Sequence, residues 1–118
     1  MKYVLVVFLG GGLGATVRYL LATALAFWHL PIPTLVANLL GCFLIGLSMP
    51  IFLAKGGSTE LRLFFVTGVL GGLTTFSTFT YETLQLAENT TLIAAFCNIA
   101  VNVLGGLALA MFGAYLAH

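Results

Sequence analysis

The sequence predicts an all-α membrane protein made of four transmembrane helices. Hydrophobic residues make up 61% of its 118 residues, charged residues make up 6%, and the mean hydropathy is +1.16. Soluble domains carry about 25% charged residues, so this composition fits a chain whose surface faces lipid. Four apolar stretches approach the roughly 20 residues that span a bilayer, at residues 3–28, 34–54, 61–86 and 91–117. Because they take up nearly the whole chain, we expect a single membrane domain over residues 1–118.

Charge and cysteine usage argue against several function classes. The net charge is +1, and four Lys and Arg residues scattered along the chain form no basic patch for nucleic acid. Cys42 and Cys97 both lie in apolar stretches, where a thiol is most often a small hydrophobic side chain rather than a disulfide or metal ligand. No nucleophile–base pair or metal-ligand cluster is visible, so we do not expect an enzyme.

The first apolar stretch begins like a secretory signal peptide, with Met1-Lys2 followed by apolar residues and small residues up to Ala15. Its apolar character continues past Arg18 to Trp28, which is longer than a typical signal core. We therefore expect this segment to be retained as the first helix.

Short connections rich in Pro, Gly and polar residues separate the helices, at residues 29–33, 55–60 and 87–90. An even number of spans places both termini on one side of the membrane. Three of the four basic residues belong to that side, and they are Lys2, Lys55 and Arg62. The positive-inside tendency favours cytoplasmic termini, although a bias this small is also compatible with insertion in both orientations.

Small residues four apart recur in the predicted helices, as Gly10 and Gly14, Ala37 and Gly41, and Gly106 and Ala110. Such pairs let helix backbones approach closely in lipid. Packing within the chain and an oligomer interface remain equally open as explanations. Four short helices can hardly enclose a conducting path alone, so we expect an oligomer.

The third stretch concentrates polar residues that lipid tolerates poorly. Glycines at positions 68, 71 and 72 precede a run in which five of seven residues carry a hydroxyl, Thr74-Thr75-Phe76-Ser77-Thr78-Phe79-Thr80. Glycine and β-branched threonine are weak helix formers, so we expect a break near residues 71–75. The backbone groups freed by a break must line a cavity or hold an ion. The alternative is an unbroken helix whose hydroxyls bond to its own carbonyls; the coincidence of glycines and hydroxyls favours the break.

Aromatic and amide side chains extend this polar region. Phe76 and Phe79 are three residues apart and face the same side of a helix. Their ring edges carry partial positive charge and suit an anion, although ordinary packing also explains such spacing. Asn38, Asn98 and Asn102 supply amide groups that donate either to an anion or to a neighbouring helix. Together these side chains predict a polar path across several helices.

Two charges lie within the apolar stretches and need a partner or a route to the interface. Arg18, well inside the first helix, could attract anions at a pore mouth. Glu82 follows the hydroxyl run and is a candidate for gating, for pairing with a cation, or for a position in the interface.

Three motifs in this order resemble the CrcB/Fluc fluoride channel family over most of the chain. They are Gly-Gly-Leu-Gly-Ala-Thr-Val-Arg-Tyr at 11–19, Pro-Thr-Leu-Val-Ala-Asn-Leu-Leu-Gly-Cys-Phe-Leu-Ile-Gly at 33–46, and Gly-Val-Leu-Gly-Gly-Leu-Thr-Thr-Phe-Ser-Thr-Phe at 68–79. The last is the most specific. The resemblance implies an antiparallel, dual-topology homodimer in a bacterial inner membrane. Two fluoride pores, each lined by both subunits, would let fluoride leave the cytoplasm passively.

The resemblance also implies roles for individual residues. Phe76 and Phe79 would offer ring edges to fluoride, with Asn38, Ser77 and Thr78 completing the pore. Asn98 and Asn102 stand where other members carry hydroxyl side chains, and we include them in the pore for their polarity. Arg18 resembles the family's vestibule arginine. The carbonyls of Gly71 and Thr74 would hold a central sodium ion, two oxygens from each subunit, since hard cations prefer oxygen ligands.

Two other function classes remain as alternatives. A small proton-coupled drug or cation exporter also packs four helices into this length, but it needs an intramembrane carboxylate, and the first helix has none while Glu82 lies late in the third. A scaffold subunit would use its polar helix faces only to bond to one another.

Overall fold

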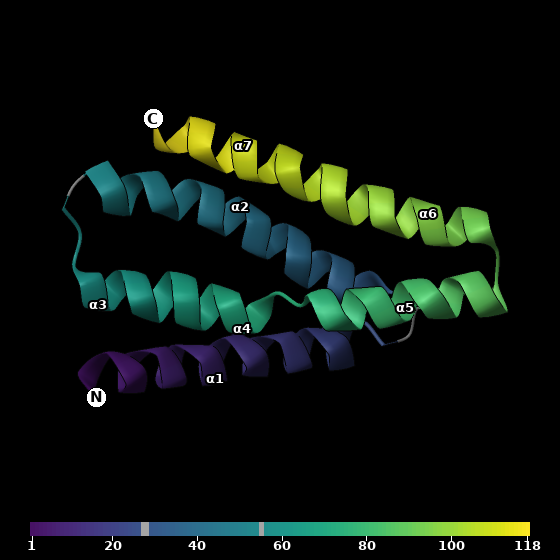
Figure 1. The fold of residues 1–118 in the computed structure, drawn as a ribbon, viewed down its shortest axis with the longest axis horizontal. Coiled ribbons are helices and arrows are strands. Elements are labelled where there is room, and N and C mark those ends of the chain that lie inside the picture. The colour runs from purple at the N-terminus through teal and green to yellow at the C-terminus, as the bar shows by residue number, and fades with distance from the viewer. Residues whose placement is uncertain (27–28, 55) are drawn as a thin grey trace.

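The computed structural model describes residues 1–26, 29–54 and 56–118, which form helices and their connections and contain no strand (Figure 1). The first two membrane helices are α1 (Lys2–Ala24) and α2 (Ile32–Ala54). The third comprises α3 (Thr59–Arg62), η1 (Leu63–Leu70), α4 (Gly71–Leu73) and α5 (Phe76–Asn89), and the fourth comprises α6 (Leu92–Ala100), η2 (Val101–Gly105) and α7 (Gly106–Ala117). Four helical segments of the described chain are long and apolar enough to cross a membrane. The chain is therefore an all-helical, multi-pass membrane protein, as the hydropathy pattern predicts.

Helix ends differ from the predicted boundaries by a few residues. The backbone leaves the helix after Ala24, where Leu25 has φ −107° and ψ 14°, so α1 ends before the predicted residue 28. Phe27 and Trp28 lie outside the described residues. The third helix is longer than predicted at both ends. At its start, the Ser58 hydroxyl accepts from the Leu61 N–H and begins α3 inside the expected connection. At its other end, α5 continues to Asn89.

Two stretches, η1 and η2, are π-helical, with wider turns than an α-helix. At the end of η1, for example, the Gly71 N–H reaches the carbonyl of Val66, five residues back. Such stretches are rare and often occur near functional sites. Both flank the centre of the molecule, where η1 leads into α4 and η2 carries Asn102.

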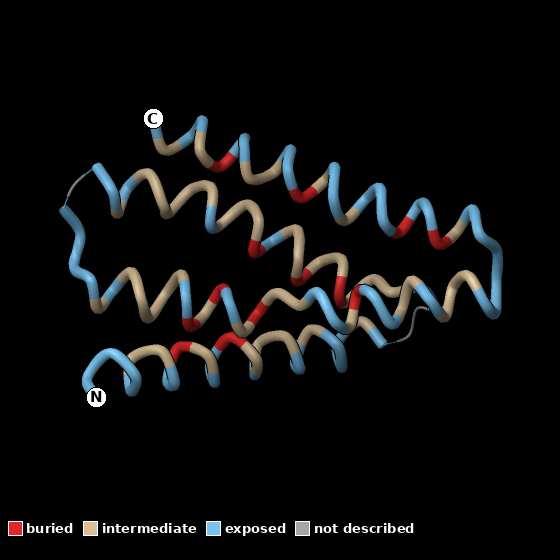
Figure 2. Tube along the Cα trace, viewed as in Figure 1, coloured by how far each residue is buried: buried red, intermediate tan, exposed pale blue. Residues whose placement is uncertain are grey.

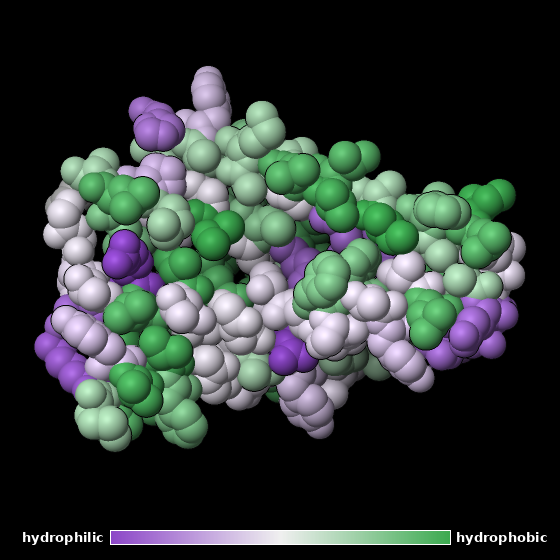
Figure 3. Space-filling view, in the orientation of Figure 1, coloured by the Kyte–Doolittle hydropathy of each residue, from purple (hydrophilic) through white to green (hydrophobic). Residues whose placement is uncertain are grey.

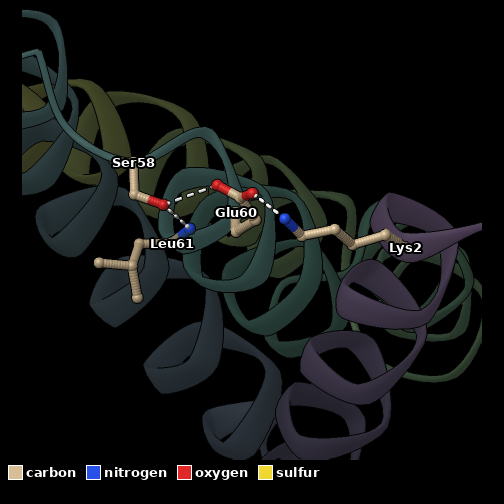
Figure 4. A network of polar contacts seen from close by, with 4 residues as sticks. All are labelled: Lys2, Ser58, Glu60 and Leu61. Atoms are coloured by element: carbon tan, nitrogen blue, oxygen red, sulfur yellow. Dashed lines mark hydrogen bonds and ion pairs between the residues drawn. The ribbon is translucent and has the colours of Figure 1, made fainter.

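Both termini lie at one end of the helix bundle, in agreement with an even number of spans (Figure 1). Close by, the Lys2 ammonium forms an ion pair with Glu60 at the start of the third helix (Figure 4). The Ser58 hydroxyl donates to the same carboxylate over 2.8 Å. This network joins the beginning of α1 to the beginning of α3. Because Lys2 is largely exposed, the pair adds little stability.

Glycines bring the helices into contact in two pairs, α1 with η1 and α4, and α2 with α7. A Cβ atom added to Gly14 would collide with the Val69 carbonyl oxygen, and one added to Gly46 would collide with that of Ala110. The small residues predicted from their spacing likewise contact this chain itself: Gly10 faces Phe64, and Gly106 faces Cys42. For these positions, packing within the chain is the interpretation that the structure supports.

This packing predicts different effects for two nearby glycines of α1. Gly14→Ala is expected to lower the free energy of unfolding by ~1–3 kcal/mol, because backbone atoms of the facing helix must shift. Gly12→Ala meets nothing within 4 Å and should leave stability unchanged or raise it by up to ~1 kcal/mol, since alanine favours the helix. Denaturation in detergent micelles, followed by circular dichroism, measures both. Equal stabilities for the two variants would contradict the close approach of α1.

Few residues are buried, and they are spread along the sides of the membrane helices that face one another (Figure 2). The core cluster consists of Ala37, Leu70 and Leu73, which join α2 to the third helix. Large apolar side chains on the outside of all four membrane helices are exposed, as expected for a lipid-facing surface. In the space-filling view, hydrophilic atoms appear in the hollowed middle of this face as well as at the ends (Figure 3).

Candidate functional site

The centre of the third helix contains two residues with extended backbone, Thr74 (φ −82°, ψ 152°) and Thr75 (φ −148°, ψ 126°). They lie between α4 and α5, visible as a thin connection in Figure 1, and fall within the range where the sequence predicts a break. The Thr74 N–H and hydroxyl both donate to the Leu70 carbonyl, at 3.0 and 2.9 Å, and end α4. The Thr75 hydroxyl accepts from the Thr78 N–H over 3.3 Å and begins α5. The two threonine side chains thus supply hydrogen-bond partners to the backbone at the end of α4 and at the start of α5.

Side chains from two other helices bind the backbone of the segment. Arg18 of α1 donates from Nε to the Gly72 carbonyl over 3.1 Å. Asn38 of α2 bonds to both sides of Thr75: its Oδ1 accepts from the Thr75 N–H at 2.8 Å, and its Nδ2 donates to the Thr75 carbonyl at 3.2 Å. Asn38 thereby replaces the backbone partners that a continuous helix would supply.

The carbonyls of Gly72 and Thr75 accept these side-chain hydrogen bonds, and those of Gly71 and Thr74 do not. The Thr75 N–H, which would reach the Gly71 carbonyl in a continuous helix, donates to Asn38 instead. Within the described chain, neither the Gly71 nor the Thr74 carbonyl accepts a hydrogen bond. Both residues line one cavity. Carbonyl oxygens without donors at membrane depth carry a free-energy cost unless they line a cavity or hold an ion.

A series of side-chain amides runs from the extended segment to α5. Asn38 donates to Asn102 Oδ1 at 3.1 Å, and Asn102 donates to Asn98 Oδ1 at 3.2 Å and to the Asn98 carbonyl at 2.9 Å. Asn98 donates to the Thr83 hydroxyl at 2.9 Å, which in turn donates to the Phe79 carbonyl at 2.7 Å. Both Nδ2 hydrogens of Asn38 have acceptors in this series. The three predicted asparagines therefore act together, joining α2, the fourth helix and α5.

The two candidate phenylalanines lie next to each other in different surroundings. Their ring centroids are 5.7 Å apart and the ring planes are inclined by 50°. Phe79 is 8% exposed, whereas Phe76 is 79% exposed. Both line the same cavity. Within one chain, neighbouring residues therefore cover the Phe79 ring, whereas the Phe76 ring is uncovered.

The cavity encloses about 400 Å³ and brings six of the predicted site residues together: Asn38, Gly71, Thr74, Phe76, Phe79 and Asn102. The other predicted residues lie around it. Ser77 is exposed, and Thr78 is half-buried against the Thr75 hydroxyl at 3.2 Å. Asn98 is buried behind Asn102, and Arg18 reaches the segment from α1.

Glu82 belongs to a second hollow of about 330 Å³, which it shares with polar residues including His29, Gln85 and Asn89. Its Oε1 accepts from the Thr34 hydroxyl over 2.8 Å, and its Oε2 is buried and has no partner among the described residues. Glu82 thus lies midway along α5 beside a polar hollow, and gating, pairing with a cation and a position in the interface all stay predictions.

Sequence analysis missed three residues of this site. Thr75 is the point at which Asn38 binds, Thr34 binds Glu82, and Thr83 accepts from Asn98. A signal was present for two of them: Thr34 precedes Asn38 by four residues and Thr83 follows Phe79 by four, so each shares a helix face with a predicted residue. The bond between Asn38 and Thr75 joins two helices and has no such signal.

Comparison with known proteins identifies the family of this chain. Residues 5–114 match the family model described as "CrcB-like protein, Camphor Resistance (CrcB)". A protein of Methanococcus maripaludis named "Fluoride-specific ion channel FluC" is 41% identical over 114 residues, which cover 96% of this chain and 93% of the relative. The protein of that name in Methanocaldococcus jannaschii is 41% identical over 99% of this chain and 95% of its own length. "Fluoride-specific ion channel FluC 1" of Yersinia pseudotuberculosis is 43% identical over 91% of this chain and 87% of its own. These relatives are named as ion channels, not as enzymes, and the chain belongs to the CrcB family.

Proposed function

We propose that this protein is a fluoride-selective ion channel. The observation that supports this most strongly is the gathering of two phenyl rings, two amides and two carbonyls without donors around one cavity at membrane depth. Membership in the CrcB family and relatives named as fluoride-specific channels point to the same ion. The proton-coupled exporter has no comparable support, because the relatives are named for a fluoride channel.

The proposed path exchanges the water shell of fluoride for weak partners. The ring edges of Phe76 and Phe79 carry partial positive charge, which attracts an anion without holding it as a full charge would. Ser77 and Thr78 of α5 add hydroxyl donors, and Asn38 of α2 with Asn98 and Asn102 of the fourth helix add amide donors. Fluoride can bind Asn38 by replacing Asn102 as acceptor, which leaves the contact with Thr75 intact. Several weak sites in succession favour conduction over trapping.

We further propose that the channel is an antiparallel, dual-topology homodimer with two pores. In one chain the cavity is open and Phe76 is exposed, and a second copy would complete the wall. The small charge bias between the two sides agrees with insertion in both orientations. The dimer would lie in the inner membrane of a bacterial cell and let fluoride that entered as HF leave passively.

A central sodium ion fits the donor set of the extended segment. The Gly71 and Thr74 carbonyls accept no hydrogen bond from the described residues and line the cavity that the partner would cover. Hard cations prefer such oxygen ligands. Two carbonyls from each subunit would hold the ion, and its charge would offset the repulsion between two anion paths.

Purified protein in liposomes is expected to support rapid, electrogenic fluoride efflux and negligible chloride efflux. A fluoride electrode and a chloride electrode measure the two rates on the same preparation, with protein-free liposomes as the control. Proton-coupled uptake of an organic cation without fluoride efflux would instead identify an exporter. Absence of both activities would favour a scaffold subunit.

A further inference from the structure

The α1 helix lies directly against the segment that ends at Leu73. A Cβ atom on Gly72 would collide with the Gly11 carbonyl oxygen, and one on Gly14 would come within 2.9 Å of the Leu73 nitrogen. Arg18 lies one turn beyond Gly14, is half-buried, and reaches the Gly72 carbonyl with Nε over 3.1 Å. Among the described residues the ion pair is Lys2 with Glu60, so no carboxylate binds Arg18. The hydrogen-bond partner of Arg18 is the backbone carbonyl of Gly72.

That contact lies next to the carbonyls proposed to hold sodium. Each peptide unit is a rigid plane, and neighbouring planes share a Cα atom and turn about φ and ψ, so a side chain that holds one carbonyl limits how far the adjoining plane can turn. Arg18 holds the plane of the Gly72 carbonyl, which adjoins that of Gly71. Asn38 holds the Thr75 N–H, which belongs to the same plane as the Thr74 carbonyl. Asn38 of α2 therefore holds the plane of the Thr74 carbonyl itself, and Arg18 of α1 holds the plane next to that of the Gly71 carbonyl.

We propose that Arg18 is a positioning residue for the cation site, acting through its hydrogen bond to the Gly72 carbonyl. The inference rests on the proposed function, because it needs sodium at Gly71 and Thr74. It goes beyond that function by giving Arg18 a role in sodium binding. The guanidinium charge repels a nearby cation, whereas the hydrogen bond of Arg18 orders the cation's ligands. Charge and hydrogen bonding thus predict opposite effects when Arg18 is replaced.

Two substitutions separate these effects. In Arg18→Gln, the amide nitrogen is the same number of bonds from Cα as the arginine Nε, so a donor is kept and the charge is lost. In Arg18→Met, the terminal methyl occupies that place, so both donor and charge are lost. Thr16→Val is the matched control on α1, because the Thr16 hydroxyl is exposed and donates to Gly12 of its own helix.

The experiment titrates sodium against N-methylglucamine at constant ionic strength, with the full-length protein in lipid nanodiscs. The readout is the 13C chemical shift of the Gly71 carbonyl, which does not depend on fluoride flux. Arg18→Met is expected to raise the half-saturating sodium concentration about tenfold, the effect of losing one hydrogen bond from a charged donor. Arg18→Gln and Thr16→Val should stay within about threefold of the parent protein.

Equal sodium responses in Arg18→Gln and Arg18→Met would overturn the positioning role and leave the sodium site in place. If Arg18→Met does not fold, Arg18→Gln decides: sodium affinity near that of the parent supports positioning, and markedly tighter binding means that charge dominates and overturns it. If the parent itself shows no sodium response, the cation site and this inference both fail. Fluoride efflux, measured separately, shows whether the channel function stands without them.

Discussion

Replacing Phe79 by isoleucine is expected to lower the initial rate of fluoride efflux about tenfold, with the fold retained. Phe79 is buried, lines the cavity and lies 5.7 Å from Phe76 between ring centroids. Isoleucine keeps an apolar side chain but has no positively polarised ring edge. Taking the upper end for a ring edge in an aromatic pair, about 1.5 kcal/mol, the loss corresponds to about tenfold. Phe76→Ile should act in the same direction, and because the two rings are in contact, the loss in the double variant should depart from the product of the two single losses.

Phe96→Ile is the matched control for this prediction. Phe96 is 66% exposed on α6 and does not line the cavity, so its replacement should leave efflux unchanged. A fluoride electrode records the initial rates from liposomes with equal protein content, and gel filtration confirms that each variant is folded. Normal efflux in both Phe76→Ile and Phe79→Ile would rule out coordination by ring edges.

Asn38→Leu is expected to lower the free energy of unfolding by about 2–5 kcal/mol and to abolish fluoride efflux. Leucine has the same branching and the same number of side-chain heavy atoms, and it makes none of the three hydrogen bonds of Asn38 with Thr75 and Asn102. The Thr75 N–H and carbonyl are then unpaired at membrane depth, at about 1–3 kcal/mol for each group. The direction of the Thr74 carbonyl is lost at the same time, because it shares a peptide plane with the Thr75 N–H.

Asn38→Asp gives an intermediate test, since it keeps an acceptor for the Thr75 N–H and removes both donors. It should be more stable than Asn38→Leu. Asn89→Leu is the control: the Asn89 side chain is exposed and donates to Gln85 of its own helix. Denaturant titration in detergent measures stability for all three. A stability of Asn38→Leu equal to that of Asn89→Leu would show that the bonds to Thr75 are dispensable.

The sequence was sufficient to predict features that depend on local pattern. Long apolar stretches predicted the four membrane helices, and their polarity within such a stretch singled out Asn98 and Asn102, which bond to each other in the structure. The extended Thr74 and Thr75 lie within the range marked by weak helix formers. Each of these features depends on residues close together in the chain.

Contacts between helices could not be predicted in the same way. Arg18 was expected to attract anions at a pore mouth, and in the structure its Nε binds the Gly72 carbonyl, 54 residues away in the chain. Neither this contact nor that of Asn38 with Thr75 leaves a periodic signal. The π-helical stretches were also missed, because over eight residues in η1 the hydrophobic pattern of a wider helix differs too little from that of an α-helix.

The glycine contacts of the two helix pairs have a consequence for biogenesis. α1 packs on a partner from the third membrane segment, and α2 packs on a partner from the fourth. The first two segments therefore enter the bilayer before their final neighbours have been synthesised. Native packing of this chain must wait until the last segment leaves the ribosome, so truncation before α7 should leave α2 with its glycine-lined surface exposed to lipid.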